Sequence, residues 1–416
     1  MFKPKRLAAS LLAVVLVLGT SLIGCGTQTA TNKSNNDANS GSQAETKEIP
    51  IGSIHPMTGS MATEGKAITN AEQMAVDKIN AAGGIKSLNG AKLKLLIGDN
   101  QGTPDKAASE AQRLIREGAV VLTGTYTSAA AVTATQEAEK AKTPFVMTVA
   151  ATTNIQERGF KYSFRIQPNA DVIANDFLTY VKQIKTPDIK TIALVHENSL
   201  FGTYFADYIK KNIDKTGLSV IADIPYAATT STLDSEVTKL QGLKPDLLVG
   251  IGYKQDQSLL LKTVHERNLK FKGIIGVANG AYSDPDAIKT LGDAANLIID
   301  VNYRWNPKNP NTATVLGNYQ QKFGTGMSGS ALWGYTAIQV IADALERAAS
   351  TDKDKIRDAL ANTNLTDHIL PQGPIKFDDK GENVNAAAVM VQVQNGKQVV
   401  VYPEQYAEAK LIFPMP

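Results

Sequence analysis

The chain has 416 residues, 43% of them hydrophobic and 20% charged, which is typical of a soluble globular protein with room for two domains. Lysine and arginine total 43 against 40 acidic residues. Three of the basic residues lie in the first 24 positions, where there is no acid, so the remaining chain is close to neutral. Composition therefore indicates neither nucleic acid nor an anionic membrane surface as a partner.

The N-terminal segment predicts export from the cytoplasm. Lys3, Lys5 and Arg6 precede an apolar run over residues 7–18. A basic segment followed by a short apolar run is typical of a secretory signal peptide, which we place at 1–24, and the run is short for a membrane span.

The segment after the signal predicts a lipid anchor. Leu22-Ile23-Gly24-Cys25 resembles the bacterial lipobox, and this resemblance implies cleavage before Cys25 and lipidation of that residue, the only cysteine of the chain. Residues 25–48 are rich in Thr, Asn, Ser and Gln and predict a flexible tether. We therefore expect an extracytoplasmic body anchored to the cell membrane through lipid.

The body alternates short apolar runs with helical apolar periodicity. In its first part we predict strands at 49–55, 93–97, 120–122, 145–149 and 160–166, and helices at 65–80, 103–116 and 128–142. In its second part we predict helices at 172–184, 201–216, 233–240 and 255–267, strands at 191–196, 220–225, 246–251 and 274–277, and a further apolar run at 296–301. This order predicts an α/β fold with two doubly wound parallel-sheet lobes.

The C-terminal part changes in style. We predict helices at 312–323, 330–349 and 356–362, and then short strands at 375–378, 387–394 and 398–402. Asn395-Gly396 between the last two is a strong hairpin signal.

A hydroxyl-rich turn between a strand and an Ala-rich helix is the first candidate for a ligand site. Thr125, Tyr126, Thr127 and Ser128 follow the strand, and Ser128 stands where the helix N-cap belongs. Free N–H groups at a helix start, flanked by hydroxyls, can hold a carboxylate. The alternative is that Ser128 only caps its helix.

The loops after the other strands could complete a cleft, because ligands of doubly wound sheets gather beyond the carboxyl ends of the strands. These loops are rich in small, hydroxyl and aromatic residues, and they span 56–64, 124–128, 148–152, 198–201, 252–253 and 278–282. Such a set could line a small-molecule cleft between two lobes.

The order of motifs resembles the branched-chain amino-acid-binding proteins of ABC transporters, which have the type I periplasmic-binding fold with a multi-strand hinge. The resemblance covers the chain from about Ile49 to its end. The motifs that carry it are His55-Pro56-Met57-Thr58-Gly59, the INAAGGI sequence at 79–85, Asp99-Asn100-Gln101 before Thr103-Pro104, Gly124 with Ser128 and Phe145, and Leu200-Phe201-Gly202.

The resemblance implies roles for individual residues. Ser128, with Thr127 beside it, would hold a ligand carboxylate, and Ala150 and Thr152 would add backbone and hydroxyl contacts to the same group. Phe201, where the family usually has Tyr, would pack on the ligand. From the second lobe, Tyr253 would close over it.

Two departures from the family pattern concern the ligand's ammonium group. Glu64 stands where the family often has an aromatic residue, and no acid stands near Asn279, where the family's ammonium-binding acid falls. A buried ammonium without a carboxylate is costly. Either Glu64 or Asp256 supplies the charge, or the ligand is not a standard α-amino acid.

No enzyme motif is convincing, and we predict no cofactor and no metal. The chain has no nucleophile elbow and no P-loop, and its four histidines are scattered. Gly324, Gly326 and Gly329 match G-x-G-x-x-G but lie between two predicted helices, where a dinucleotide site would need a preceding strand.

The sequence therefore predicts a monomeric solute-binding lipoprotein of an ABC importer, with permease subunits as partners. We expect one lobe at 49–168 plus 301–366 and the other at 169–300 plus 367–416, with crossings near 166–169, 299–303 and 363–372. The ligand would be a branched-chain amino acid or a related carboxylate. Alternatives are a surface sensor that uses the same cleft, a binder of an amide or aromatic acid, and a secreted enzyme on a similar scaffold.

Overall fold

The computed structural model describes residues 47–416, which belong to one compact unit. The predicted signal peptide, Cys25 and nearly all of the predicted tether lie outside the described residues. No helix within 47–416 combines the length and apolar character that crossing a membrane requires.

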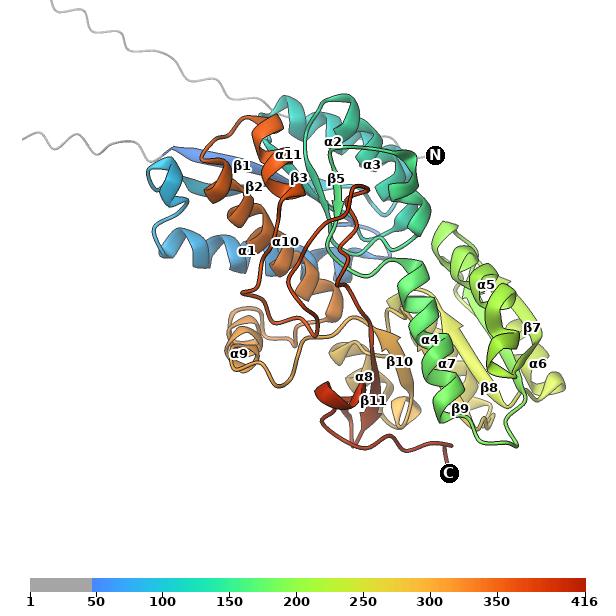
Figure 1. Cartoon of the computed structure of the whole chain (residues 1–416). Coiled ribbons are helices and arrows are strands. Elements are labelled where there is room, and N and C mark those ends of the chain that lie inside the picture. Colours follow the sequence, from blue (N-terminus) through green and yellow to red (C-terminus); the bar gives the residue numbers. More distant parts are fainter. Residues whose placement is uncertain (1–46) are drawn as a thin grey trace, which may run out of the picture. The chain divides into compact units, whose positions relative to one another are not determined.

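The first sheet is parallel throughout, in the order β2-β1-β3-β4-β5 (Figure 1). Its strands are β1 (Glu48–His55), β2 (Lys92–Asp99), β3 (Val121–Gly124), β4 (Phe145–Met147) and β5 (Ser163–Arg165). The connecting helices are α1 (Ala62–Ala81), α2 (Pro104–Arg116) and α3 (Ser128–Lys140). Strands β3, β4 and β5 are buried along their whole length, as expected for a parallel sheet covered on both faces.

The second sheet has the order β12-β11-β10-β9-β8-β6-β7. Strands β6 (Thr191–Glu197), β7 (Ser219–Tyr226), β8 (Leu247–Ile251), β9 (Gly273–Val277) and β10 (Ile299–Asn302) are parallel, whereas β11 (Val389–Gln394) and β12 (Lys397–Tyr402) are antiparallel. The helices of this part are α4 (Ala170–Ile184), α5 (Leu200–Asn212), α6 (Asp234–Leu243), α7 (Lys254–Glu266) and α8 (Pro285–Leu291). Two parallel-dominated sheets with connecting helices confirm the predicted α/β class.

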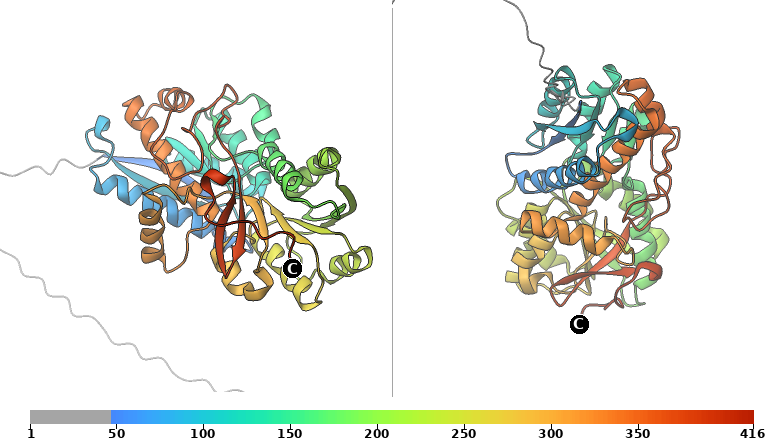
Figure 2. Two further views of the ribbon diagram at one scale, coloured as in Figure 1. Left: turned by 60° about the horizontal axis from the view of Figure 1, so that its bottom comes forward. Right: turned by 90° about the vertical axis from the view of Figure 1, so that its left-hand side faces the viewer.

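Three later helices, α9 (Thr312–Phe323), α10 (Gly329–Ala348) and α11 (Lys353–Ala361), follow the second sheet in the chain. Even so, α10 packs along α1 of the first sheet, and the views of Figures 1 and 2 show the two helices side by side. Close approach depends on Gly334, where a Cβ atom would lie 2.7 Å from the backbone oxygen of Ile68. The chain therefore returns to the first sheet after completing most of the second.

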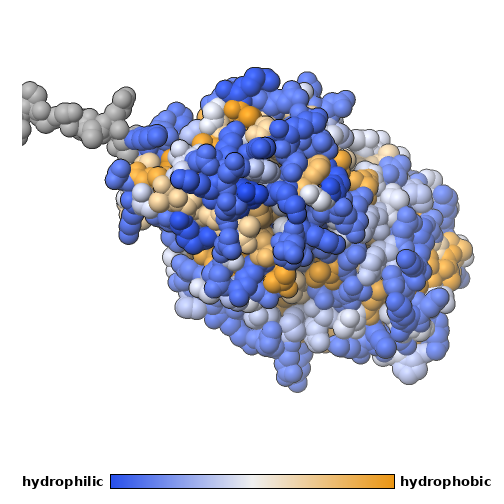
Figure 3. All heavy atoms as spheres, turned by 45° about the horizontal axis from the view of Figure 1, so that its top comes forward, coloured by the Kyte–Doolittle hydropathy of each residue, from blue (hydrophilic) through white to orange (hydrophobic). Residues whose placement is uncertain are grey.

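Short 3-10 helices lie between the main elements: η1 (Lys86–Leu88), η2 (Thr153–Arg158), η3 (Ile213–Thr216), η4 (Gly292–Ala295) and η5 (Glu404–Tyr406). On the face shown in Figure 3, hydrophobic residues occur as scattered groups among hydrophilic ones.

Most predicted elements are confirmed within a few residues, two predictions are wrong, and one helix is missed. Residues 375–378 form no strand, because Ile375 and Phe377 make only isolated bridges to Leu365 and Asn383. Helix α8 was not predicted, although Asp284 caps it and Pro285 opens it. The helix predicted to 216 ends at Asn212 and tightens into η3.

Two turn predictions are confirmed. The β11–β12 hairpin turns at Asn395 and Gly396, with φ of 53° and 71°, which suits the Asn-Gly pair. The Gly324–Gly329 stretch joins α9 to α10 and is an interhelical loop.

Candidate functional site

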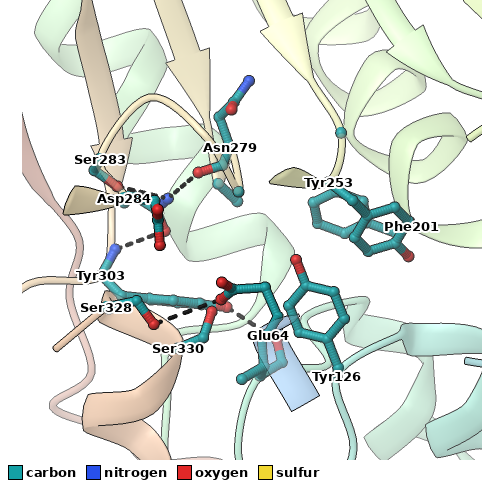
Figure 4. Close-up of a pocket in the computed structure, with 16 residues that line it drawn as sticks. Glu64, Tyr126, Phe201, Tyr253, Asn279, Ser283, Asp284, Tyr303, Ser328 and Ser330 are labelled. Carbon is teal, nitrogen blue, oxygen red and sulfur yellow. Dashed lines mark hydrogen bonds between the residues drawn. The ribbon is translucent and has the colours of Figure 1, made fainter. Parts of the chain in front are cut away.

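A small cavity lies where strand ends of both sheets meet. Its volume is about 40 Å³. Val149, Tyr126, Tyr253, Asn279 and Tyr303 line it, and each follows the carboxyl end of a different strand, as Figure 4 shows for the last four. The cavity therefore occupies the edge at which ligands of doubly wound sheets bind.

Aromatic rings close one side of this cavity. The ring centroid of Tyr253 lies 5.4 Å from that of Tyr126 and 5.4 Å from that of Phe201 (Figure 4). Tyr126 follows β3 of the first sheet, whereas Phe201 and Tyr253 follow β6 and β8 of the second. These rings form a contact between the two halves, and a ligand entering here would meet aromatic faces.

A cluster of three charged side chains borders the rings. Lys254 Nζ lies 3.2 Å from Glu64 Oε1 and 2.7 Å from Asp284 Oδ1. Burial raises the pKa of Glu64 to about 7, with a further contribution from the Asp284 charge, and burial also raises the pKa of Asp284. Burial opposes the charge of Lys254 too, but the two carboxylates outweigh it and raise its pKa. With both acids ionised, the cluster carries one excess negative charge.

Asn279 lines the cavity, but its side chain is already engaged. Its Nδ2 donates to Gly250 O at 3.1 Å and to Gln257 Oε1 at 2.7 Å, and its Oδ1 accepts from the N–H groups of Ala281 and Tyr282. Asn279 therefore holds the loop after β9 in shape.

The turn before α3 differs from the sequence prediction in its cap. The N-cap is Thr127, whose Oγ1 accepts from Ala130 N at 3.4 Å, and Ser128 is the first helical residue. The prediction of Ser128 as cap is wrong by one position, because either hydroxyl suits a cap and only the backbone path decides between them. Ser128 Oγ instead accepts from Thr152 N at 3.4 Å.

Several donors in and beside this turn lack acceptors. Within residues 47–416, the N–H groups of Ser128 and Ala129 donate to no protein acceptor. The hydroxyl of Thr152 is buried without a hydrogen-bond partner in the same part of the chain. The N–H of Ala150, in contrast, donates to Thr125 O at 3.1 Å.

The eight candidate binding residues thus fall into two groups. Glu64, Phe201, Tyr253 and Asn279 line the cavity. Thr127, Ser128, Ala150 and Thr152 are buried beside one another around the start of α3 and do not line it.

A larger cavity of about 350 Å³ adjoins the first and shares Glu64, Tyr126 and Tyr253 with it. Asp256 lines this second cavity. Its Oδ2 accepts from Tyr226 Oη at 2.6 Å, its Oδ1 has no partner within residues 47–416, and burial raises its pKa to about 7.

Sequence reasoning placed Tyr126 in the candidate turn without giving it a role, and it did not select Lys254, Asp284, Tyr303 or Ser328 as site residues. Tyr126 and Lys254 each adjoin a predicted site residue, so loop position alone could have suggested them. Ser328 Oγ caps α10 by accepting from Ala331 N at 3.1 Å and lies 3.5 Å from Glu64 Oε2. No local signal in the sequence connects Ser328 with Glu64.

Comparison with known proteins gives consistent results. The family model described as periplasmic binding protein matches residues 48–398. The Leu/Ile/Val-binding protein homolog 8 of Brucella abortus (strain 2308) is 31% identical, covering 88% of this chain and 93% of its own. Homolog 7 of Brucella suis biovar 1 (strain 1330) is 28% identical, and the match covers 90% of this chain and 96% of that protein.

Solved structures share the fold. The substrate-binding protein LivJ of Streptococcus pneumoniae, in complex with isoleucine, gives a TM-score of 0.75 at 23% identity and covers 88% of this chain and 100% of its own. A solute-binding protein of an ABC transporter from Rhodopseudomonas palustris BisB5, in complex with 3,4-dihydroxybenzoic acid, gives a TM-score of 0.76 at 21% identity. The match covers 88% of this chain and 98% of that protein.

Proposed function

The chain belongs to the periplasmic binding protein family, and from this premise we propose that it is the solute-binding lipoprotein of an ABC importer. It would be anchored outside the cytoplasm through Cys25 and would capture a small carboxylate-bearing ligand between its two halves. The proposal involves binding and release of the ligand without chemical change.

One observation carries the ligand class: donors without acceptors lie near one another at the start of α3. The N–H groups of Ser128 and Ala129 have no acceptor within residues 47–416, and the buried Thr152 hydroxyl beside them has none either. A buried donor without an acceptor costs free energy. A carboxylate would satisfy all three donors, and the positive end of the helix favours its charge.

Glu64 is the acid best placed to hold an ammonium group on the same ligand. It lines both cavities, and its cluster with Lys254 and Asp284 has one excess negative charge when ionised. Asp256 lines only the larger cavity and is bonded to Tyr226. We therefore propose a branched-chain amino acid or a related compound as ligand, with Phe201 and Tyr253 packing on its side chain.

Capture would proceed by closure of two lobes around the ligand. Contacts between the halves already include the Tyr126–Tyr253 ring pair and the Glu64–Lys254 ion pair. A ligand that adds contacts only in the closed arrangement shifts the population toward it. We propose lobes at 49–168 plus 301–366 and at 169–300 plus 367–416, with hinge crossings near 166–169, 299–303 and 363–372. The closed protein would then dock on permease subunits as a monomer.

A second candidate ligand is an aromatic acid or an amide without an amine. The engaged Asn279 side chain and the ring-rich wall favour it, and the Rhodopseudomonas palustris relative in the fold comparison holds an aromatic acid. A surface sensor would use the same cleft. Neighbouring genes for permease and ATPase subunits would support transport over sensing.

A thermal-shift screen with matched ligands tests the proposal. Leucine, isoleucine and valine are compared with 4-methylpentanoate, which lacks the amine, and with leucinamide, which lacks the carboxylate. We expect stabilisation by the amino acids and none by leucinamide. Stabilisation by 4-methylpentanoate or benzoate alone would instead support the second candidate. Stabilisation by leucinamide but by no carboxylate would contradict both.

A further inference from the structure

Arg304, just beyond β10, is a buried cation without an acid at ion-pair distance in residues 47–416. Its side chain donates to Gln398 Oε1 and, at 3.3 Å, to the Gln398 carbonyl oxygen. Its Nε is buried without a partner in the described chain. Burial lowers its pKa to about 9, and the more distant charge of Glu408 only partly opposes this.

An isolated buried charge is costly unless an opposite charge accompanies it. A cavity of about 310 Å³ lies against this guanidinium, within the size range of small-molecule sites. Arg304 and Lys397 line it, and no acidic residue does. The cavity shares no lining residue with the two cavities near Tyr253.

The rest of this cavity is largely apolar. Trp305, Met327, Leu316 and Ile288 contribute to its walls, and the guanidinium carbon of Arg304 lies 3.6 Å from the centre of the Trp305 ring. Gln398, on the hairpin strand β12, adds an amide nitrogen that is buried without an acceptor in residues 47–416. Unused donors at one end and apolar walls elsewhere fit a carboxylate on an apolar body better than a fully hydrated inorganic anion.

We propose that this cavity is a second ligand site, separate from the cleft, for a small organic carboxylate with an aromatic or branched apolar body. Arg304 and Gln398 would donate hydrogen bonds to the carboxylate, and Lys397 would add charge from the rim. The apolar body would lie against Trp305 and Met327. This inference does not depend on what the cleft binds.

Tryptophan fluorescence gives a local test. The chain has two tryptophans, and Trp333 is buried in α10, so a contact quencher in this cavity reports on Trp305. The probes are 4-bromobenzoate, its neutral counterpart 4-bromobenzamide and inorganic phosphate. We expect saturable quenching by 4-bromobenzoate and no displacement of this probe by phosphate. 4-Bromobenzamide should bind at least about 10-fold more weakly than 4-bromobenzoate, because only the carboxylate can form a charge-assisted hydrogen bond.

Variants assign the signal to the site. Trp305→Phe should remove the quenching, and Arg304→Met should weaken 4-bromobenzoate binding about 10-fold or more. Lys397→Met removes an exposed cation and should weaken it about 3-fold, which provides a readout if Arg304→Met does not fold. Ser128→Ala, at the cleft, should leave the quenching unchanged.

Four results would overturn the proposal: quenching that stays linear with probe concentration, equal quenching by the amide, full affinity in a folded Arg304→Met or Lys397→Met protein, or loss of quenching in Ser128→Ala. Displacement by phosphate would overturn the assignment to organic carboxylates. Failure of the cleft to bind any amino acid or aromatic acid would leave this test unaffected.

Discussion

The ammonium nitrogen of Lys254 lies 3.2 Å from Oε1 of Glu64, a residue 190 positions earlier in the chain. Lys254 opens α7 beside the second sheet, and Glu64 lies in the first turn of α1 beside the first. Both side chains are largely buried. The pair therefore joins the two halves at the edge of the proposed ligand site and makes their contact sensitive to charge.

The free energy of unfolding should fall as pH rises toward neutrality, because the burial that raises the pKa of Glu64 outweighs the favourable pairing of its ionised form with Lys254. Because burial raises the pKa of Glu64 from 4.5 to about 7, the folded protein binds more protons than the unfolded chain in this interval. Stability from protonated Glu64 is fully present below about pH 4.5 and is lost as pH rises through about 7. Thermal melts of wild type and Glu64→Gln from pH 4.5 to 8 measure this effect.

Burial also raises the pKa values of Asp256 and Asp300 to about 7, so these acids contribute to the pH dependence of the wild-type melts. Comparison with Glu64→Gln isolates the contribution of Glu64. The melting temperature of wild type minus that of Glu64→Gln should fall across the interval. A difference that stays constant or rises would show that Glu64 is not protonated in the folded protein at acidic pH.

The close packing of α10 on α1 predicts opposite effects for two glycine substitutions. Gly334→Ala places a Cβ atom 2.7 Å from Ile68 and should destabilise the protein by about 1–3 kcal/mol despite alanine's better helix propensity. Gly317→Ala in α9 meets no atom within 4 Å and should stabilise it by up to about 1 kcal/mol. Denaturant unfolding measures both, and equal effects would mean that α10 does not approach α1 closely.

Phe201 offers a test of the aromatic wall. Phe201→Ala removes a ring that faces Tyr253 and should weaken binding of the stabilising ligand about 10-fold, the cost of losing one large apolar contact. Phe201→Tyr keeps the ring and should bind within about 3-fold of wild type. Calorimetric titration distinguishes them. Unchanged affinity in Phe201→Ala would place the ligand elsewhere.

Much of the fold was predictable because its signals are local. Apolar runs such as 191–196 and 274–277 mark buried parallel strands, and the Asn395-Gly396 pair marks a hairpin. Residues 375–378 have the apolar character of a strand, yet they only bridge to nearby loops. A segment becomes a strand only if a partner strand lies beside it, and the sequence of this short segment does not show whether one does.

The site was predictable in part for the same reason. Glu64, Phe201, Tyr253 and Asn279 lie in segments that loop position after a strand selected, the family resemblance singled them out individually, and all four line the cavity. The engagement of Asn279 by Gln257 and the pairing of Glu64 with Lys254 and Ser328 depend on contacts between distant segments. Backbone geometry decides whether Thr127 or Ser128 is the helix N-cap. The sequence cannot distinguish them, because both residues carry a hydroxyl that suits a cap.

The central claim is that a ligand carboxylate is bound at the start of α3, and calorimetric titration of Thr152→Val beside Thr133→Val tests it most directly. Thr133 lies in the same helix, but its hydroxyl donates to Pro104 O, away from the donors that lack acceptors. With the ligand found by thermal shift, Thr152→Val removes the hydroxyl donor and should bind about 10- to 100-fold more weakly, as expected for loss of a hydrogen bond to a charged group, and Thr133→Val should bind as wild type does. Wild-type affinity in Thr152→Val, or an equal loss in both variants, would contradict the account.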